Sequence, residues 1–360
     1  MATHQKDQAT TQPPAAANQD QAAAPLFFRD ILGQERVISH LKTAMAKGRL
    51  SHAYLFLGPE GVGKASVARA LAAALNCAQP RADGDACGEW PSCRRLAAGT
   101  NPDFLVIGPT ESLQIRIGQI RDFRRVTTYP PFGGGWRVAL IKPAEALNEE
   151  AANALLKTLE EPPDRHVLVL TALGEADLLP TVVSRCHKLA FAPLPAPLVA
   201  RELMKRRGLP PARAALLAAL SGGSLGRALN LDPEELLAQR RQVLADLARL
   251  AEGSAAGVLD WAQRLAKNRA ELDSFLLMAQ LWYRDLLLAH YRAPAPLLAH
   301  QDLASELDAA RDAGTPETWF AKFSALGAAQ RHLQANLNPE LTLDILGLRL
   351  QRHGYMHDAR

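Results

Sequence analysis

A glycine-rich stretch, LFLGPEGVGKAS at residues 55–66, contains the residues of this chain that are best suited to chemistry. Gly58 and Gly63 frame four residues that include Gly61, and Lys64 follows directly. Glycines at this spacing let backbone N–H groups converge on phosphate oxygens, and the lysine adds a positive charge. A helix that starts after the loop presents the positive end of its dipole to the same anion. We therefore predict a nucleotide-phosphate site at Gly58, Gly61, Gly63 and Lys64.

The usual ligands of the accompanying metal ion are absent from this sequence. The position after Lys64 commonly supplies a Ser or Thr hydroxyl to Mg²⁺, and here it is Ala65. Ser66 is one residue late and would point about 100° away on a helix, so we expect at most a weak phosphate contact from it. The strand that should end in an acidic residue is followed by Lys142, and Glu145 is expected to be a surface carboxylate. We predict weak or vestigial ATP/Mg²⁺ binding without hydrolysis; alternatively, Lys142 replaces the cation and neutralises phosphate charge directly.

Composition narrows the class of protein. Of 360 residues, 48% are apolar and 6% aromatic, and the formal net charge is +4. Such a chain can bury a sizeable core and favours helices, and its net charge does not indicate a protein coated in nucleic acid. No apolar run has membrane-spanning length and the N-terminus lacks a signal-peptide core, so we expect a cytoplasmic protein with no membrane partner.

The cysteines favour a metal cluster over disulfides. Three of the four lie within residues 77–93, which in a reducing compartment is typical of metal ligands. The fourth, Cys186, is expected to be a small, buried, apolar residue.

Alternating strand and helix patterns predict a mostly parallel sheet with helices on both faces, which is an α/β fold class. Short apolar runs predict the strands Ala53–Leu57, Asp103–Ile107, Arg137–Ile141, His166–Thr171 and His187–Phe191. Helical periodicity predicts the helices Glu35–Lys47, Lys64–Cys77, Gln119–Val126 and Asn148–Glu161. Tyr129–Gly135 (YPPFGGG) is predicted to be a turn, because glycine and proline dominate it.

Four segments are predicted along the chain. The first is rich in Ala, Gln, Thr and Pro, which is typical of a disordered tail. The second contains the sheet and a cysteine-containing insert at residues 77–99. After the Pro-Leu-Pro at residues 193–195 no strand pattern remains, and amphipathic stretches occur at Leu259–Leu288 and Glu317–Arg352. The predicted bounds are 1–24 for the tail, 25–194 for the α/β domain, 195–244 for a small helical domain and 245–360 for a second helical domain.

Four motifs share one resemblance. They are Phe28–Gln34 (FRDILGQ), His52–Lys64 (HAYLFLGPEGVGK), Asn153–Pro163 (NALLKTLEEPP) and Leu178–Cys186 (LLPTVVSRC). The chain resembles bacterial clamp-loader subunits of the AAA+ family, closely over residues 28–191 and by layout beyond them. The resemblance implies an AAA+ P-loop sheet, a helical lid at 195–244 and a C-terminal all-helical collar at 245–360.

Two arginines take roles from this resemblance. Arg185 matches an arginine finger, which reaches into a neighbouring subunit's ATP site and stabilises charge on the transferring phosphate. Arg227, in Gly222–Arg227 (GGSLGR), matches a lid arginine that contacts nucleotide phosphates. Without the resemblance, a surface salt bridge and an ordinary helix-surface arginine are the alternatives.

The resemblance also implies a zinc module with four cysteine ligands. Cys77, Cys87 and Cys93 match three of them, and Trp90 occupies the remaining place. Structural zinc sites need four ligands in a tetrahedral array, so Zn²⁺ has an incomplete ligand set here. The alternative is a zinc-free insert packed around Trp90. The carboxylates that are candidates for the fourth ligand are Glu89, Asp85 and Asp83.

Within this family the chain fits the delta-prime type, a stator, better than the gamma/tau motor type. Pro-Ala-Glu at residues 143–145 and the two missing metal ligands both favour it. The resemblance then implies a hetero-oligomer with gamma/tau and delta subunits that uses ATP to load a sliding clamp on primed DNA during replication. It also implies membership of a DNA-directed DNA polymerase (nucleotidyltransferase) holoenzyme, although nothing in this chain resembles a polymerase active site. Arg121, Arg124 and Arg125 would follow the DNA backbone, or form a solvated basic helix.

Two other functions stay open from the sequence. The first is an ATP-hydrolysing motor subunit of the gamma/tau type, whose turnover would need Lys64. The second is a DNA-binding AAA+ scaffold, which would bind primed DNA without affinity for motor subunits.

Overall fold

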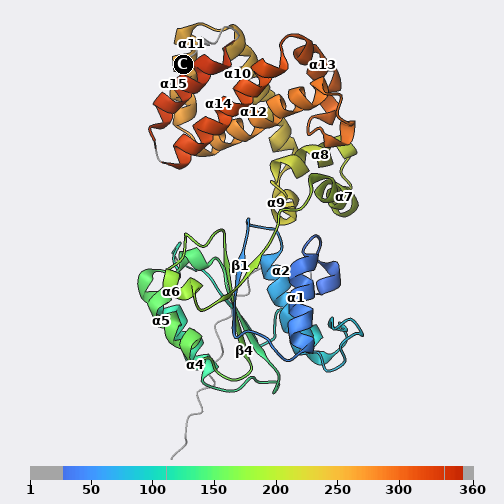
Figure 1. Ribbon diagram of the computed structural model, residues 1–360, viewed down its shortest axis with the longest axis vertical. Helices are drawn as coiled ribbons and strands as arrows, with labels where there is room; N and C mark the ends of the chain where they lie inside the picture. The colour runs from blue at the N-terminus through green and yellow to red at the C-terminus, as the bar shows by residue number, and fades with distance from the viewer. Residues whose placement is uncertain (1–26, 111, 336, 352–360) are drawn as a thin grey trace, which may run out of the picture. The chain divides into compact units, whose positions relative to one another are not determined.

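The computed structural model describes residues 27–110, 112–335 and 337–351, so the predicted tail at residues 1–24 lies outside the described residues. The chain divides into two compact units, both drawn in Figure 1. Unit 1 runs to Phe191 but lacks Pro59–Val62, and unit 2 consists of Pro59–Val62 and the residues from Ala192 onward. Within the described ranges, no helix is long and apolar enough to cross a membrane.

Unit 1 is built around a parallel sheet, which has five strands in the described residues. The strands are β1 (Ala53–Leu57), β2 (Phe104–Ile107), β3 (Arg137–Ile141), β4 (His166–Ala172) and β5 (His187–Ala190). Their order is β2-β3-β4-β1-β5. Phe56 of β1 lies beside Thr171 of β4 on one side and Leu189 of β5 on the other. The segment that follows β1 therefore starts at the carboxyl edge of the sheet, next to the end of β4, where α/β folds commonly bind ligands.

Helices cover both faces of this sheet (Figure 1). The helical segments of unit 1 are η2 (Phe28–Asp30), α1 (Glu35–Ala46), α2 (Lys64–Leu75), α3 (Pro91–Ala97), α4 (Ile117–Thr127), η3 (Ala144–Ala146), α5 (Glu149–Glu160) and α6 (Pro180–Val183). On one face, Ile120 of α4 and Leu155 of α5 are fully buried in the core cluster with residues of β3 and β4. Val67 and Leu71 of α2 are also fully buried, and α2 packs against β3 and β4. The apolar residues that recur at helical spacing thus supply the core.

The described part of unit 2 is helical. Its elements are α7 (Ala196–Arg207), α8 (Pro211–Leu220), α9 (Leu225–Asn230), α10 (Pro233–Glu252), α11 (Ala255–Ala266), α12 (Arg269–His290), η4 (Ala295–Leu297), η5 (Gln301–Leu303), α13 (Ala304–Asp312), α14 (Pro316–Gln334) and α15 (Pro339–Leu350). The helix α12 packs against α10, α13 and α14. Capping side chains start several helices: Asp232, Thr315 and Asn338 each accept a backbone N–H from the first turn, directly before a proline.

The predicted α/β fold class, a parallel sheet with helices on both faces followed by a helical region, is confirmed. The stretches predicted at Leu259–Leu288 and Glu317–Arg352 each contain a break. Asn268 caps α12 by accepting the N–H of Glu271, and Asn338 caps α15, so a new helix begins at each point. The predicted domain boundary at residue 244 falls inside α10, and the division of unit 2 into lid and collar stays a prediction.

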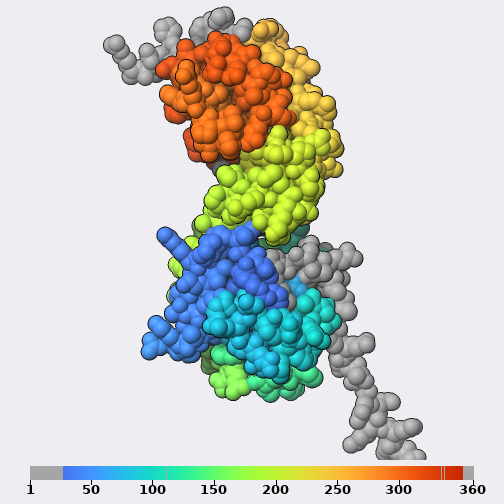
Figure 2. All heavy atoms as spheres, turned by 90° about the vertical axis from the view of Figure 1, so that its right-hand side faces the viewer, coloured from blue at the N-terminus to red at the C-terminus, as the bar shows by residue number. Residues whose placement is uncertain are grey.

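The insert contains a helix that the sequence did not predict, α3. It is fixed to α2 by the buried Arg69, whose Nη2 donates to the carbonyls of Leu96 (2.8 Å) and Ala97 (3.3 Å). Lys42 of α1 pairs with Asp83 at 2.8 Å. In Figure 2 the cyan surface of the insert accordingly lies against the blue surface of the N-terminal segment.

Candidate functional site

The glycine geometry of the phosphate loop is present. Gly58 has φ 147° and Gly63 has φ 108°, conformations that residues with a side chain rarely adopt. A side chain on Gly58 would also clash with the carbonyl of Phe191. Gly63 directly precedes α2, and the Nζ of Lys64 donates to the carbonyl of Gly58. The lysine thus lies across the loop that it was predicted to serve.

The tip of the loop, Pro59–Val62, packs within unit 2 against the start of α9. The N–H of Gly226 donates to the carbonyl of Gly61 at 3.1 Å, and a side chain on Gly61 would clash with Oγ of Ser224. Ser224 in turn caps α9 by accepting the N–H of Arg227 at 3.0 Å. The side chain of Arg227 is exposed. Two predicted site residues, Gly61 and Arg227, therefore lie in the same part of unit 2.

No acidic side chain follows directly on β3 at the sheet edge. Lys142 follows β3, donates its backbone N–H to Ile107 at 2.9 Å and is half-buried. Next to it, on β4, lies a buried hydroxyl that the sequence analysis missed: Oγ1 of Thr171 is 3.4 Å from the carbonyl of Ile141. A threonine that ends the apolar run HVLVL was the available signal. At this edge Lys142 offers an ammonium group, which has no lone pair for Mg²⁺, and the Thr171 hydroxyl donates to the carbonyl of Ile141.

Glu145 is not the surface carboxylate that we expected. It is half-buried, and its Oε2 is buried without a hydrogen-bond partner among the described residues. The reason is that η3, which carries it, folds back onto the protein: the carbonyl of Ala146 accepts the N–H of Ile115 at 2.7 Å. Sequence spacing could not reveal this contact because its partner lies far away in the chain.

Arg185 lies between α6 and β5, where α6 ends. Its Nη2 is 2.8 Å from Oε1 of Glu160, the last residue of α5, and its Nη1 donates to the carbonyl of Thr181 at 3.0 Å. The side chain is 38% exposed, so the guanidinium is accessible from outside unit 1. The neighbouring Cys186 is buried as expected, and burial raises its pKa to about 12.

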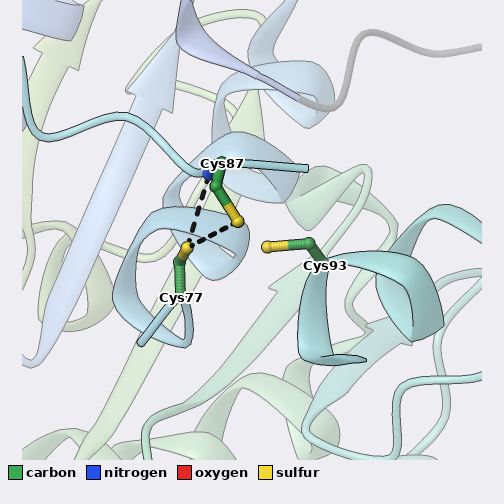
Figure 3. Close-up of side chains that lie close together, drawn as sticks. All are labelled: Cys77, Cys87 and Cys93. Carbon is green, nitrogen blue, oxygen red and sulfur yellow. Dashed lines mark hydrogen bonds between the residues drawn. The ribbon is translucent and has the colours of Figure 1, made fainter. Parts of the chain in front are cut away.

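Three cysteines converge at the insert (Figure 3). Cys77 follows α2, Cys93 is on α3, and Cys87 is in the loop between them; the three Sγ atoms lie within 4.8 Å of one another. The Sγ atoms of Cys77 and Cys87 are 3.4 Å apart. The N–H groups of Trp90 and Glu89 each donate to Sγ of Cys87 at 3.3 Å and lower its pKa to about 7. Burial raises the pKa of Cys93 to about 11.

The positive φ of Gly88, 93°, lets the chain turn so that these N–H groups reach Sγ of Cys87. A tetrahedral ion with bonds of about 2.3 Å to sulfur separates two sulfurs by about 3.8 Å. The three thiols therefore fit a thiophilic metal ion after small adjustments. Such an ion would tie α2, the loop and α3 together.

None of the candidate carboxylates completes the cluster. Both carboxylate oxygens of Asp85 are engaged elsewhere, accepting the N–H groups of Phe28, at 3.2 Å, and of Arg29, at 3.1 Å. Asp83 pairs with Lys42. Among the described residues, no carboxylate or imidazole joins the three thiols, which excludes Glu89 as well in this conformation. The place between Cys87 and Cys93 in sequence belongs to Trp90, which is 37% exposed.

A basic groove lies between the C-terminal halves of α4 and α5. It has a volume of about 840 Å³. Its charged lining consists of Arg121, Arg124, Arg125, Lys157, Glu160 and Glu161. Four cationic and two anionic side chains give it a positive balance, and one of the two carboxylates, that of Glu160, is the partner of Arg185.

A buried ion pair next to this groove was not predicted from the sequence. Nη2 of Arg137 lies 3.1 Å from Oδ1 of Asp103, and both side chains are almost fully buried. Asp103 also accepts the N–H groups of Phe132 (2.9 Å) and Gly133 (3.1 Å), and Arg137 donates to the carbonyl of Tyr129 at 2.8 Å. The pair therefore fixes the predicted YPPFGGG turn.

Comparisons with known proteins agree with the motifs. Residues 33–195 match the family described as "DNA polymerase III, delta subunit". "DNA polymerase III subunit delta'" of Pseudomonas aeruginosa is 45% identical over 204 residues, which are 56% of this chain and 61% of that protein. "DNA polymerase III subunit tau" of Escherichia coli is 34% identical over 256 residues, which are 69% of this chain and 39% of that protein. The chain thus spans less than two thirds of the length of either relative.

Among solved structures, a DNA polymerase III gamma subunit-related protein from Thermotoga maritima is 21% identical to this chain. The match covers 88% of this chain and 98% of that one, with a TM-score of 0.34. The resemblance that the four motifs predicted is confirmed by the sequence relatives.

Proposed function

We propose that this chain, which over residues 33–195 matches the family described as "DNA polymerase III, delta subunit", acts as a delta-prime-type stator of a clamp loader. The observation that carries the proposal is that the chain has a phosphate loop without metal ligands and, at a different place, an accessible arginine. The chain keeps the glycines and lysine of a phosphate loop, has no carboxylate or hydroxyl at the two positions that hold Mg²⁺, and presents an accessible arginine at position 185. Such a subunit contributes to catalysis on a neighbour's nucleotide.

The proposed catalytic group is Arg185, acting in trans. Arginine suits this role because its planar guanidinium binds phosphate oxygens with two parallel hydrogen bonds and stabilises charge as the phosphoryl group transfers. Its contacts in the isolated chain, Glu160 and the Thr181 carbonyl, lie at the surface. An arginine finger is worth about 10³ or more in rate at its site.

The chain's own phosphate loop is proposed to bind nucleotide weakly, through Gly58, Gly63, Lys64 and backbone N–H groups. Ser66, half-buried in the first turn of α2, is at most a minor contact. Arg227, on α9, is proposed to contact the nucleotide phosphates from the helical lid. Titration with nucleotide in EDTA tests whether Lys142 replaces the metal ion: binding that is lost on Lys142→Ala but insensitive to EDTA would support it, whereas no binding in EDTA would exclude it.

The three-cysteine cluster is proposed to hold Zn²⁺ as a structural ion. Cys77, Cys87 and Cys93 supply thiolates, and the ion would cross-link the insert in place of a larger core. The basic groove is proposed to contact the phosphate backbone of primed DNA without sequence preference. Replacing Arg121, Arg124 and Arg125 by alanine should then reduce the salt dependence of DNA binding by the assembled complex.

The partners proposed for this chain are gamma/tau and delta subunits in a hetero-oligomer, and, through that complex, a sliding clamp on primed DNA. The deciding experiment is reconstitution with those subunits and measurement of clamp-dependent ATP hydrolysis and clamp loading. Arg185→Ala should abolish hydrolysis at one site, while the control Lys188→Ala, which removes a nearby exposed cation, should leave it unchanged. Equal activity of the Arg185→Ala complex and the unaltered complex would refute the proposal.

A second candidate, a gamma/tau-type motor, is favoured by the 34% identity to a tau subunit and by the intact glycine geometry. It requires ATP turnover by the chain alone that Lys64→Ala abolishes. A DNA-binding scaffold would instead bind primed DNA and fail to associate with the motor subunits.

A further inference from the structure

The cysteine cluster has three ligands where a structural zinc site has four. Structural sites are closed by four protein side chains, whereas sites with three protein ligands keep a fourth position for a small molecule. Here, the described residues offer the thiols of Cys77, Cys87 and Cys93 and no further thiol, imidazole or carboxylate in the group. Two carboxylates near the cluster in sequence, Asp83 and Asp85, contact α1 and η2 instead.

The exposure of the individual residues shows which side of the cluster faces solvent. Cys77 and Cys93 are buried at 8% and 0% exposure. Cys87 is only half-buried, and the adjoining Glu89 and Trp90 are exposed. A small molecule can therefore approach along the Cys87 side. In sequence, Trp90 lies between the ligands Cys87 and Cys93.

The thiols are already arranged for an ion. Backbone N–H groups of Glu89 and Trp90 point at Sγ of Cys87, and that of Cys87 points at Sγ of Cys77 at 3.3 Å. Hydrogen bonds of this kind stabilise thiolate charge and orient the ligands. Backbone N–H groups donate these hydrogen bonds, so the bonds remain when the side chain of Trp90 is replaced.

We propose that Cys77, Cys87 and Cys93 form a three-thiolate site for a thiophilic divalent ion, whose fourth coordination position is completed from solution by a small thiol, imidazole or water. The metal-binding part rests on the zinc site proposed above, and the open position is the new element. Two properties follow. The ion exchanges more readily than in a four-cysteine site, and small external ligands change its coordination.

Cobalt(II) is the probe for this site because its visible absorption reports both thiolate ligation and coordination geometry. The full-length, reduced chain should bind about one Co²⁺ with thiolate charge-transfer bands, and Cys87→Ser should weaken the binding strongly. Adding imidazole or a small thiol should shift the absorption of the unaltered protein. Absence of Co²⁺ binding to the unaltered chain would overturn the metal site itself.

The open position is tested separately with Trp90→Cys, which offers a fourth thiol at the place the indole now occupies. This change should raise zinc affinity by roughly tenfold or more, measured by competition with a chromophoric chelator, and should abolish the spectral response to imidazole. Trp90→Ala is the matched control, since it removes the indole and adds no ligand; its affinity should stay close to that of the unaltered chain. A spectrum of the unaltered protein that ignores external ligands would overturn the open position while leaving metal binding, and the stator function, intact.

Discussion

At the scale of the residue, the salt bridge of Arg185 bears directly on the finger role proposed for this side chain. In the chain by itself its guanidinium pairs with Glu160 at 2.8 Å, with exposures of 38% and 50% for the two side chains. Such a surface pair contributes at most about 1 kcal/mol, because water screens it. A neighbour's phosphate, which carries more charge and accepts two parallel hydrogen bonds, competes readily for the same group. The salt bridge that the sequence offered as the ordinary role is therefore compatible with the proposed finger.

Replacing Glu160 by glutamine should free Arg185 without removing it. We expect hydrolysis by the assembled complex to stay equal or to rise by less than about fivefold, the equivalent of 1 kcal/mol. The measurement is steady-state ATP hydrolysis with clamp and primed DNA. Glu161→Gln changes the adjacent exposed carboxylate and serves as the control. A loss as deep as that of Arg185→Ala would mean instead that Glu160 holds the guanidinium in its working orientation.

At the scale of the element, the ion pair of Asp103 and Arg137 joins the start of β2 to the start of β3 and fixes the turn between α4 and β3. Asp103→Ala would leave a buried guanidinium without its carboxylate and free two N–H groups. We expect the free energy of unfolding of unit 1 to fall by about 3–5 kcal/mol. Urea titration monitored by circular dichroism measures this change. Asp122→Ala, which removes a pair that is 3.9 Å long and exposed, should change stability by less than about 0.5 kcal/mol. Similar small effects of both changes would contradict this account.

A second element-scale contact makes the stability of unit 2 depend on pH. The hydrogen bonds and charge of Arg240 lower the pKa of Asp302 in the folded protein, and His300 adds to the effect. Because the folded pKa lies below the unfolded one, the pair stabilises unit 2 above the ordinary pKa of an aspartate. That stabilisation is lost as pH falls through the depressed folded value.

Asp302→Asn should therefore destabilise the protein at pH 7 and make its stability fall less steeply towards pH 3 than that of the unaltered chain. Melting temperatures across this range measure the effect. The control is Asp260→Asn, an exposed aspartate on α11. Parallel curves for Asp302→Asn and the unaltered chain would show that Arg240 and Asp302 do not interact as described.

The elements that the sequence predicted well are those with strong periodicity. The five strands begin and end within about two residues of the predicted bounds, because continuous apolar runs bounded by turns are typical of buried parallel strands. The helix α3 was missed since it has only seven residues, within a segment of Cys, Gly and Pro. Its one local signal was Pro91 in the first turn.

The parts of the site that sequence could not predict depend on partners far along the chain. The convergence of three cysteines follows from their spacing, but the absence of a fourth ligand required knowing that Asp85 binds residues 56 and 57 positions away. Asp103 was predicted to start a strand, whereas its bonds to N–H groups 29 and 30 residues later depend on tertiary structure.

At the scale of the whole molecule, the phosphate loop and the proposed arginine finger lie at two different places in the chain. Its phosphate loop has the backbone that cradles phosphate, and α2 begins there, yet Ala65 and Lys142 stand where metal ligands would be. Arg185, in contrast, is accessible at the surface of unit 1. A motor subunit needs the phosphate-loop groups to hydrolyse its own ATP, whereas a stator needs Arg185. Substitutions in the loop and at Arg185 should therefore have opposite relative effects on ATP hydrolysis for the two functions.

This contrast gives the last prediction, a comparison of Lys64→Ala with Arg185→Ala in the same reconstituted complex. If the chain is a stator, Lys64→Ala should change clamp-dependent ATP hydrolysis by less than about twofold, because the lysine contributes to phosphate binding at a site that does not turn over. Arg185→Ala should remove about 10³ or more in rate at the neighbouring site. Size-exclusion chromatography must show that both complexes assemble equally, so that the rates compare the same assembly. The reverse pattern, with Lys64 essential and Arg185 dispensable, is what a gamma/tau-type motor predicts, since a motor depends on its own lysine to bind the nucleotide it hydrolyses.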